Sequence, residues 1–133
     1  MIIRIAKKED LSRLNDIMQR SKAYWGYDAG FMKKFMEKFG LDLDYVEQEN
    51  AYIASINTNV VGFYSFSLDA ENQLELDNFF LHPEFIGQGF GQIMWEHCAD
   101  TAKNYNASFF ILLSYPNAEG FYHRMCCIKI GER

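Results

Sequence analysis

Three glycines at alternating positions precede a run of helical character in the segment HPEFIGQGFGQIMW, residues 82–95. Gly87, Gly89 and Gly91 are costly to order, because glycine loses more conformational freedom on folding than any other residue. A loop without side chains that enters a helix N-terminus directs several unpaired N–H groups the same way, and the helix dipole favours negative charge there. The segment therefore predicts an anion site suited to a pyrophosphate. The alternative is a glycine-rich turn that only changes the direction of the chain.

The spacing of these glycines differs from two common phosphate-binding loops. A dinucleotide fingerprint requires G-x-G-x-x-G, and here the third glycine arrives one residue early. A P-loop requires a glycine followed by lysine and then serine or threonine, whereas Gly91 is followed by Gln92 and Ile93. The expected anion site therefore belongs to another class of loop.

Two carboxylates occupy alternate positions in the segment QLELDNFFL, residues 73–81, which leads into the glycines. Glu75 and Asp77 share one face of an extended strand, because successive side chains point to opposite faces. Such a pair can accept a proton through water and attract a cationic amine. The alternative is a polar strand face that is simply solvated. His82 and His123 are weaker rivals for the role of base, since their charge can change near neutral pH.

Aromatic residues and one carboxylate gather in the segment AYWGYDAG, residues 23–30. Tyr24, Trp25 and Tyr27 lie next to Asp28, and aromatic faces combined with a carboxylate suit a cationic amine. Tyr24 and Trp25 could equally complete the hydrophobic core. The segment is the candidate acceptor site.

Composition narrows the class of protein. The chain has 13 basic and 18 acidic residues, a net charge of −5, and no basic run longer than two residues, which argues against nucleic-acid binding. Cys98, Cys126 and Cys127 form no C-x-x-C pair and share no metal-ligand spacing with the histidines, so we expect free thiols and no metal. Without a signal peptide or membrane span, a cytoplasmic protein with no membrane partner is expected. A length of 133 residues predicts a single domain, 1–133.

Hydrophobic periodicity places these residues on strands and helices. Helical spacing of apolar residues predicts helices over about 7–25, 29–39, 89–105 and 117–125. Alternating or continuous apolar runs predict strands over 2–6, 51–56, 60–68, 73–81, 108–114 and 126–130. The run SFFILLS, residues 108–114, is expected to be a central strand buried on both faces. The helix at 89–105 is expected to bury Phe90, Ile93, Met94, Cys98 and Ala102. The order β-α-α-β-β-β-α-β-α-β predicts an α+β fold built on a mixed sheet.

The glycine segment, preceded by the strand ELDNFFL, resembles the acyl-coenzyme A motif of the GNAT superfamily of N-acetyltransferases. Gly89 and Gly91 match the two small positions of that motif, and Ile86 stands where the family has Arg or Gln. The resemblance implies that backbone N–H groups hold the pyrophosphate of coenzyme A. These groups belong to Gly87, Gln88, Gly89, Phe90, Gly91 and Gln92.

A second block, SYPNAEGFYHRMCC at 114–127, resembles a later motif of the same family. Asn117, Ala118, Phe121 and Tyr122 align with it, whereas Cys126 and Cys127 stand where Gly and an apolar residue are usual. A third stretch, SKAYWGYDAGF at 21–31, is similar to a segment common in small bacterial members. The resemblance covers essentially the whole chain and implies a mixed, mostly antiparallel central sheet flanked by helices. The usual final strand is missing, so either the chain is naturally short or a partner, as in a homodimer, covers the exposed strand edge.

The resemblance also implies roles for single residues. Tyr122 is the expected general acid for the coenzyme A thiolate, because a phenol titrates near ~10 and a thiol near ~8.5. Asn117 is expected to bind the pantetheine arm or brace its loop, and an ordinary helix N-cap is the alternative. Freed N–H groups of Phe79, Phe80 and Leu81 are expected to bind the carbonyl oxygen.

The function implied by this resemblance is transfer of an acetyl group from acetyl-coenzyme A to a primary amine of a small molecule or a protein. In that reaction Glu75 or Asp77 would serve as the base. The alternative is a catalytically silent, regulatory module that binds acyl-coenzyme A, which the departures at Ile86 and Cys126–Cys127 keep open.

Overall fold

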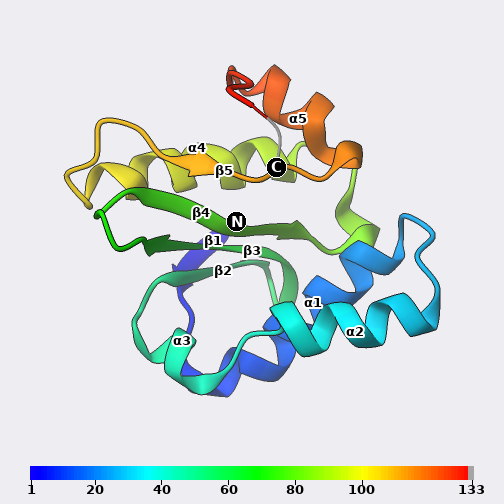
Figure 1. Cartoon of the computed structure of the whole chain (residues 1–133). Helices are drawn as coiled ribbons and strands as arrows, with labels where there is room; N and C mark the ends of the chain where they lie inside the picture. Colours follow the sequence, from blue (N-terminus) through cyan, green and yellow to red (C-terminus); the bar gives the residue numbers. More distant parts are fainter. Residues whose placement is uncertain (132–133) are drawn as a thin grey trace.

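A five-stranded sheet with the order β1-β2-β3-β4-β5 forms the centre of the computed structural model, which describes residues 1–131 (Figure 1). Strands β1 to β4 pair antiparallel, and β5 pairs parallel with β4. The strands are β1 (Ile2–Ile5), β2 (Ala51–Ile56), β3 (Asn59–Leu68), β4 (Leu74–Leu81) and β5 (Ile111–Leu112). The predicted mixed, mostly antiparallel sheet is confirmed.

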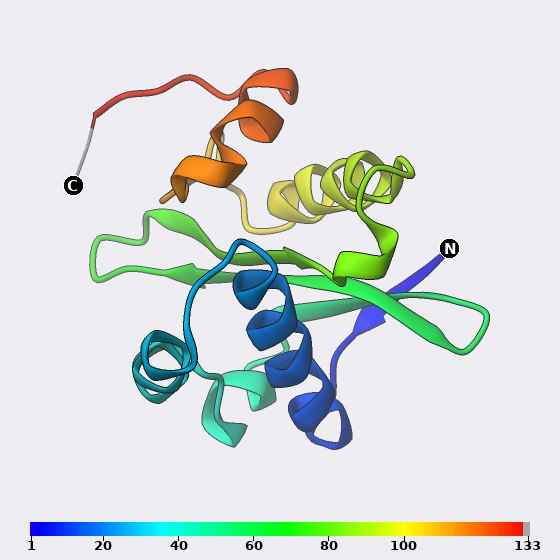
Figure 2. The same ribbon diagram turned by 90° about the vertical axis from the view of Figure 1, so that its right-hand side faces the viewer.

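Helices cover both faces of this sheet, as Figure 2 shows most clearly. One face carries α1, α2 and α3, and the opposite face carries α4 and α5. The helices are α1 (Leu11–Ala23), α2 (Ala29–Phe39), α3 (Leu43–Glu47), α4 (Phe90–Lys103) and α5 (Glu119–Arg124). Short 3₁₀ helices are η1 (Lys8–Asp10), η2 (Pro83–Phe85) and η3 (Pro116–Ala118).

Each face of the sheet has its own hydrophobic core, and β3 contributes to both. Phe63 packs with the buried residues of α1 and α2, whereas Tyr64 and Phe66 pack with those of α4. All three side chains are fully buried, and each such burial contributes roughly 1.5–3 kcal/mol to stability. Strand β3 therefore fixes the position of its neighbour β4, which carries the candidate carboxylates.

Local sequence signals place several of these elements. The side chain of Asp28 caps α2 as expected, with its Oδ1 accepting a hydrogen bond from the N–H of Phe31 at 2.7 Å. Asn57 adopts a φ of 56° in the tight turn of the β2–β3 hairpin. In α4, Met94, Cys98 and Ala102 are buried as predicted.

The predicted inner face of α4 needs a correction at one position. Ile93 is 48% exposed, whereas Trp95 and Thr101 are buried. The buried face is therefore rotated toward Trp95, which packs on aromatic rings from β4 and α5. Helical periodicity alone does not show which large side chain faces the sheet.

The predicted central strand at 108–114 is wrong. Only Ile111 and Leu112 form a strand, and they lie at the edge of the sheet. Phe109 and Leu113 are 62% and 55% exposed, so the run is not buried on both faces. The run instead packs on the protein through one side only, where the ring of Phe110 contacts that of Trp95.

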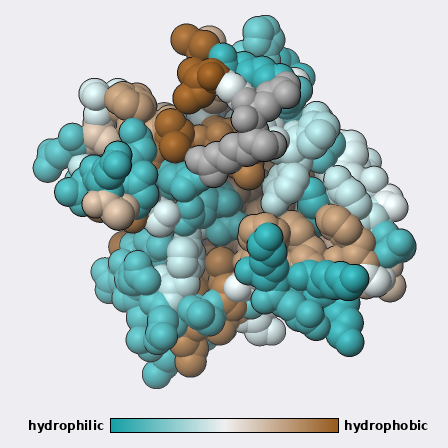
Figure 3. All heavy atoms as spheres, in the orientation of Figure 1, coloured by the Kyte–Doolittle hydropathy of each residue, from teal (hydrophilic) through white to brown (hydrophobic). Residues whose placement is uncertain are grey.

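The predicted last strand at 126–130 is also wrong. Cys126 has a φ of 68°, a left-handed conformation that turns the chain away at the end of α5. Ile128 and Ile130 are consequently 84% and 85% exposed. Figure 3 shows strongly apolar atoms at the top of the molecule, where this C-terminal segment runs.

One helix escapes the sequence prediction. α3 begins after Asp42, whose Oδ1 accepts a hydrogen bond from the N–H of Tyr45 at 2.9 Å. This N-cap was visible in the sequence LDLDYVEQ, but the helix is too short for periodicity to reveal it. In residues 1–131, no helix is long and apolar enough to cross a membrane.

Candidate active site

The glycine segment forms the turn into α4. Gly87 and Gly89 have φ values of 81° and 85°, in the left-handed region that favours glycine, and Gly89 is the N-cap of α4. A Cβ atom at either position would meet no atom within 4 Å, so it is the backbone conformation that requires glycine there.

Gly91 is needed for a different reason. A Cβ atom on Gly91 would lie 3.3 Å from the ring of Phe121, tighter than an ordinary contact. The bare first turn of α4 therefore lets α5 approach closely. This contact joins the glycine segment to the helix that carries Tyr122.

The backbone donors of this segment face no protein acceptor. Within residues 1–131, the N–H groups from Gly87 to Gln92 donate no hydrogen bond, and the first helical bond of α4 runs from Ile93 N–H to Gly89 O. Unpaired N–H groups at a helix N-terminus, aligned with its dipole, suit an anion. The donor set fits the pyrophosphate that the sequence predicts.

The loop is held in shape although Ile86 replaces the usual Arg or Gln. The side-chain amide of Gln88 donates to the carbonyl of Glu84 at 2.9 Å, and the rings of Phe85 and Phe90 pack edge to face at 5.7 Å. The Ile86 side chain is 37% exposed. Gln88 therefore braces the loop through its side chain, which leaves its backbone N–H for a ligand.

Strands β4 and β5 diverge beside this loop. They pair only at Glu75–Ile111 and Leu76–Leu112. A bulge accompanies the divergence, because the β3–β4 register passes from Ser65–Asn78 to Phe66–Leu76 and leaves Asp77 as the extra residue.

The remainder of β4, beyond the bulge, has one edge that β5 does not cover. Successive N–H groups of a strand point to opposite edges. The His82 N–H donates to the Val61 carbonyl of β3 at 2.7 Å, so the N–H of Phe80, two residues earlier, also points toward β3. Of the predicted donors, Phe79 and Leu81 therefore point toward the uncovered edge. The three N–H groups cannot all serve one carbonyl oxygen.

Aromatic rings from β4, α4 and α5 pack together on the α4 side of the sheet. Phe79, Trp95, Phe121 and Tyr122 form one cluster, in which Tyr122 lies 5.7 Å from Trp95 and 5.5 Å from Phe121, ring centre to ring centre. The Tyr122 hydroxyl has no hydrogen-bond partner in residues 1–131. It is not fully buried either, because Asn50 Oδ1 is the one side-chain atom of that range that is both fully buried and unpaired. Tyr122 therefore presents an unpaired hydroxyl to accessible space.

Burial raises the pKa of Tyr122 well above that of a free phenol. The side chain therefore stays protonated at neutral pH and can donate a hydrogen bond. Complete proton transfer from Tyr122 to a thiolate therefore becomes less favourable. The cost is about 1.4 kcal/mol for each unit by which the pKa of the phenol exceeds that of the thiol. The chemistry suits hydrogen bonding to a departing sulfur better than full general-acid transfer.

Asn117 lies in η3, before α5, where the predicted helix at 117–125 begins as a separate 3₁₀ turn. Its side chain is exposed and makes no hydrogen bond within residues 1–131. The N-cap of α5 is Ala118, so the N-cap alternative for Asn117 is wrong. Cofactor binding by Asn117 stays a prediction.

Asp77 is held by two hydroxyl groups. The Tyr45 hydroxyl donates to Oδ2 at 2.6 Å, and Ser67 donates to Oδ1 at 2.9 Å. Burial, together with the hydrogen bond to Asp77, raises the pKa of Tyr45, so this hydroxyl keeps its proton. Sequence reasoning missed Tyr45, because only the fold brings α3 against β4.

The carboxylates of Glu75 and Asp77 line a hollow of about 610 Å³ between α2, α3, β4 and the segment after β5. Other lining residues include Phe35, Tyr45 and Tyr115. The two residues thus line one hollow, and their role as the base stays a prediction. The rival bases are placed less well: His82 Nδ1 accepts from the Glu84 N–H, and His123 is exposed on α5.

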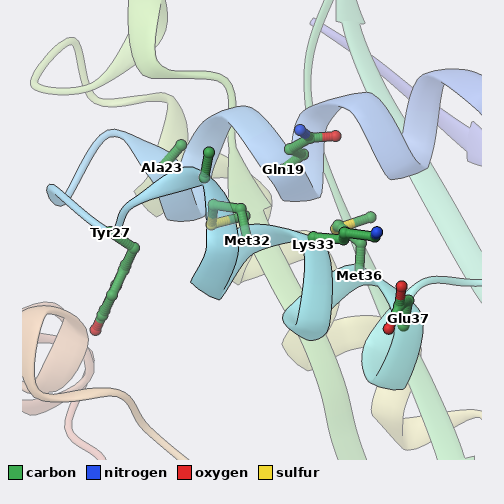
Figure 4. Close-up of a pocket in the computed structure, with 8 residues that line it drawn as sticks. Gln19, Ala23, Tyr27, Met32, Lys33, Met36 and Glu37 are labelled. Carbon is green, nitrogen blue, oxygen red and sulfur yellow. The ribbon is translucent and has the colours of Figure 1, made fainter.

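A second hollow, of about 720 Å³, lies between α1 and α2 (Figure 4). Gln19 and Ala23 border it from α1, and Met32, Lys33, Met36 and Glu37 border it from α2. In Figure 4 Tyr27 extends from the α1–α2 loop toward α5. This hollow contains no pair of carboxylates and lies away from the glycine loop.

The four predicted acceptor residues lie outside the hollow that contains the carboxylates. Tyr24 and Trp25 are 55% and 47% exposed and pack edge to face on each other, so their alternative role in the core is wrong. Asp28 is engaged as the cap of α2, and Tyr27 stacks on Phe31 at 4.4 Å. These four residues do not line the hollow that contains Asp77.

The sequence pattern of the acetyltransferase (GNAT) family matches residues 11–126. The chain belongs to this family. Membership implies acyltransferase activity, with a donor based on coenzyme A. In a search of curated proteins, no sequence matches significantly.

Solved structures share this fold at low sequence identity. The PaiA N-acetyltransferase of Thermoplasma acidophilum, in complex with coenzyme A, has a TM-score of 0.75 at 18% identity, covering 94% of this chain and 86% of that one. A GCN5-related N-acetyltransferase of Ralstonia eutropha has a TM-score of 0.79 at 14% identity, covering 99% and 95%. A predicted acetyltransferase of Clostridium acetobutylicum with acetyl-coenzyme A has a TM-score of 0.73 at 18% identity, covering 99% and 92%.

Proposed function

We propose that this protein transfers the acetyl group of acetyl-coenzyme A to a primary amine. The observation that carries the proposal is the set of unpaired N–H groups from Gly87 to Gln92, placed next to the diverging ends of β4 and β5. A pyrophosphate on these donors would direct the rest of the cofactor along the uncovered edge of β4. Family membership and the neighbours solved with coenzyme A or acetyl-coenzyme A support this assignment.

Acetyl-coenzyme A, when bound, supplies an activated thioester carbonyl. Asp77 faces the hollow with its carboxylate oriented by Tyr45 and Ser67, and can take the proton of the incoming ammonium directly or through water. Glu75 lines the same hollow and adds to its attraction for a cation. The free amine can then attack the carbonyl carbon.

Two further groups of the chain act on the other side of the reacting bond. The N–H of Phe79 or of Leu81, on the uncovered edge of β4, would stabilise negative charge that develops on the carbonyl oxygen. Tyr122 would donate a hydrogen bond to the sulfur of coenzyme A, which would leave as the thiolate. Asn117, exposed at the start of the segment that carries α5, would bind the pantetheine arm.

The proposal is tested by mixing the purified protein with acetyl-coenzyme A and a panel of amines, amino acids, polyamines, aminoglycosides and peptides. Release of free coenzyme A is measured together with the binding of acetyl-coenzyme A by calorimetry. Turnover with at least one amine is the expected result. Tight binding without turnover would favour the silent regulatory module instead, and absence of binding would refute both functions.

We propose further that residues 1–133 act as one domain. A homodimer and a cytoplasmic location stay predictions. Light scattering during size-exclusion chromatography measures the oligomeric state. Fractionation of cells that express the protein measures its location.

A further inference from the structure

A chain of four polar side chains crosses the bulge in β4. The Tyr45 hydroxyl lies 2.6 Å from Oδ2 of Asp77 and 2.9 Å from Oγ of Ser65, and the side-chain amide of Asn78 donates to the same Oγ at 2.9 Å. Ser65 is fully buried on β3, directly opposite Asn78. The chain therefore runs Asn78–Ser65–Tyr45–Asp77 and joins α3 to both strands.

The directions of these hydrogen bonds follow from the number of hydrogens available. A phenol carries a single hydrogen and an ionised carboxylate only accepts, so the hydrogen of Tyr45 goes to Asp77. In the contact between the two hydroxyls, Ser65 is then left as the donor to the Tyr45 oxygen, and its own oxygen accepts from Asn78. Every donor therefore points along the chain toward the carboxylate.

Asp77 is held at both of its oxygens although the residue is exposed. Tyr45 from α3 donates to Oδ2, and Ser67 from β3 donates to Oδ1 at 2.9 Å. An exposed carboxylate without such partners exchanges among several rotamers, whereas two donors from different elements select one. Hydrogen bonds that are aligned head to tail also polarise one another, which strengthens the last contact, the one to the carboxylate.

Asn78 links this chain to the backbone of the cofactor half. Asp77 is the extra residue of the bulge, Asn78 pairs with Ser65, and the N–H of Phe79 then points toward the uncovered edge of β4. The side-chain hydrogen bond of Asn78 fixes the backbone between these two neighbours. One network thus holds both a carboxylate that lines the hollow and an N–H group beside the diverging strands.

We propose that Tyr45 and Asn78, joined through Ser65, are positioning residues that hold the Asp77 carboxylate and the Phe79 N–H in a fixed relation. This inference rests on the proposed function, since it concerns the same site. Tyr45 acts through Asp77, which takes the proton of the acceptor amine, and Asn78 acts through the Phe79 N–H, which binds the thioester carbonyl. The reacting groups must be held in place closely, because small displacements cost much of the rate.

The test removes the two ends of the chain one at a time. Tyr45→Phe removes the hydroxyl and keeps the ring, and Asn78→Ala removes the amide. Tyr52→Phe, in a half-buried tyrosine on the opposite face of the sheet, is the matched control. Both variants are also combined with Asp77→Ala, which removes the carboxylate. Steady-state assays with the best amine give kcat and KM, and calorimetry gives the affinity for acetyl-coenzyme A.

Tyr45→Phe and Asn78→Ala should each lower kcat roughly 10-fold, the value of one strong hydrogen bond, with acetyl-coenzyme A bound as before. Tyr52→Phe should leave kcat unchanged. In the Asp77→Ala background, Tyr45→Phe should cause no further loss, because no carboxylate is left to position, whereas Asn78→Ala should still lower the rate through Phe79.

Three results would overturn the inference. An unchanged kcat in either single variant would remove that residue from the reaction. A full further loss from Tyr45→Phe in the Asp77→Ala background would mean that Tyr45 contacts the substrate itself. No further loss from Asn78→Ala in that background would break its link to Phe79.

The chain is also judged without turnover. If the wild-type protein acetylates no amine, the proposed function fails, and denaturant unfolding then measures the coupling between Tyr45 and Asp77 in a double-mutant cycle. Tyr45→Phe should lower the folding equilibrium constant roughly 10-fold when Asp77 is present and less than about twofold in Asp77→Ala. Such coupling upholds the network, whereas equal losses in both backgrounds overturn it.

Discussion

The two halves of the candidate active site are built from different parts of the chain. The cofactor half consists of backbone N–H groups in one short segment, Gly87 to Gln92. The proposed acceptor half consists of side chains from α2, α3, β4 and the segment after β5. A site made of backbone N–H groups depends on the conformation of the chain, so it tolerates Ile86 in place of the usual Arg or Gln. The specificity of a site made of side chains changes with every residue that lines it. The difference explains why the cofactor is easier to infer than the acceptor.

The largest effect is expected in the acceptor half, at Asp77. Asp77→Asn removes the proton acceptor while keeping the shape of the side chain, so kcat should fall by roughly 10²- to 10³-fold, within the range of general-base catalysis. Steady-state assays with the best amine measure it, and calorimetry should find acetyl-coenzyme A binding unchanged. The control Ser67→Ala removes one hydrogen bond to the same carboxylate and should cost less than Asp77→Asn. A fully active Asp77→Asn variant would move the base to Glu75 or to water.

The cofactor half is tested at Gly89. Gly89→Val forces a β-branched residue into a φ of 85°, so the loop should change shape and the affinity for acetyl-coenzyme A should fall by roughly 10- to 100-fold. Gly26→Val is a matched control, because Gly26 has a φ of 93° and similarly open surroundings in another loop. Calorimetry on both folded variants gives the comparison. Equal affinity in both variants would show that the loop does not hold the cofactor.

A smaller effect is expected where the two halves meet, at Tyr122. Tyr122→Phe removes the hydroxyl but keeps the ring that packs on Trp95, so kcat should fall about tenfold while acetyl-coenzyme A binds as before. Tyr105→Phe, another half-buried tyrosine against the α4 core, should leave kcat unchanged. Because burial raises the pKa of Tyr122, the rate should show no alkaline loss from this group near neutral pH. An unchanged kcat in Tyr122→Phe would assign the sulfur to another donor.

The smallest effect concerns stability at Lys22. Its pKa in the folded protein is about 8, below the unfolded value near 10.5, so the unfolded chain binds more protons between these values. Burial of the charge therefore lowers the free energy of unfolding below pH 8, and this penalty disappears as the pH rises from 8 toward 10.5. Relative to Lys22→Met, the wild-type protein should gain stability over that range, by at most about 1.4 kcal/mol per pH unit.

Denaturant unfolding of both proteins at pH 7, 8, 9 and 9.5 measures this difference, and other titrating groups largely cancel between them. A constant difference across the series would mean that Lys22 titrates normally, as a solvated lysine does.

Several elements could be predicted because their signals are short-range. The cap at Asp28, the hairpin between β2 and β3, and the glycines before α4 all act within a few residues. The alternation of β4 likewise indicated that Glu75 and Asp77 share one face, and they line one hollow. Such features depend on backbone conformation and periodicity, which a sequence displays directly.

Other features depended on contacts between distant segments. The apolar run at 108–114 reads as a buried strand, but only two of its residues pair, because β4 and β5 diverge. Tyr45 reaches Asp77 across 32 positions of the chain, and Lys22 reaches Tyr115 across a still longer separation. Neither contact has a local pattern, since both depend on how α1 and α3 pack on the sheet.

The sequence by itself determined the class of this protein, because the glycines before α4 and the alternating strand ahead of them form a local pattern that resembles the family. The tertiary structure decided which side chains line the hollow beside β4, which hydroxyls hold Asp77, and that the buried Lys22 has no ion-pair partner within residues 1–131. Those properties arise from packing between elements far apart in the chain, where burial and charge are set by neighbours that no short segment contains.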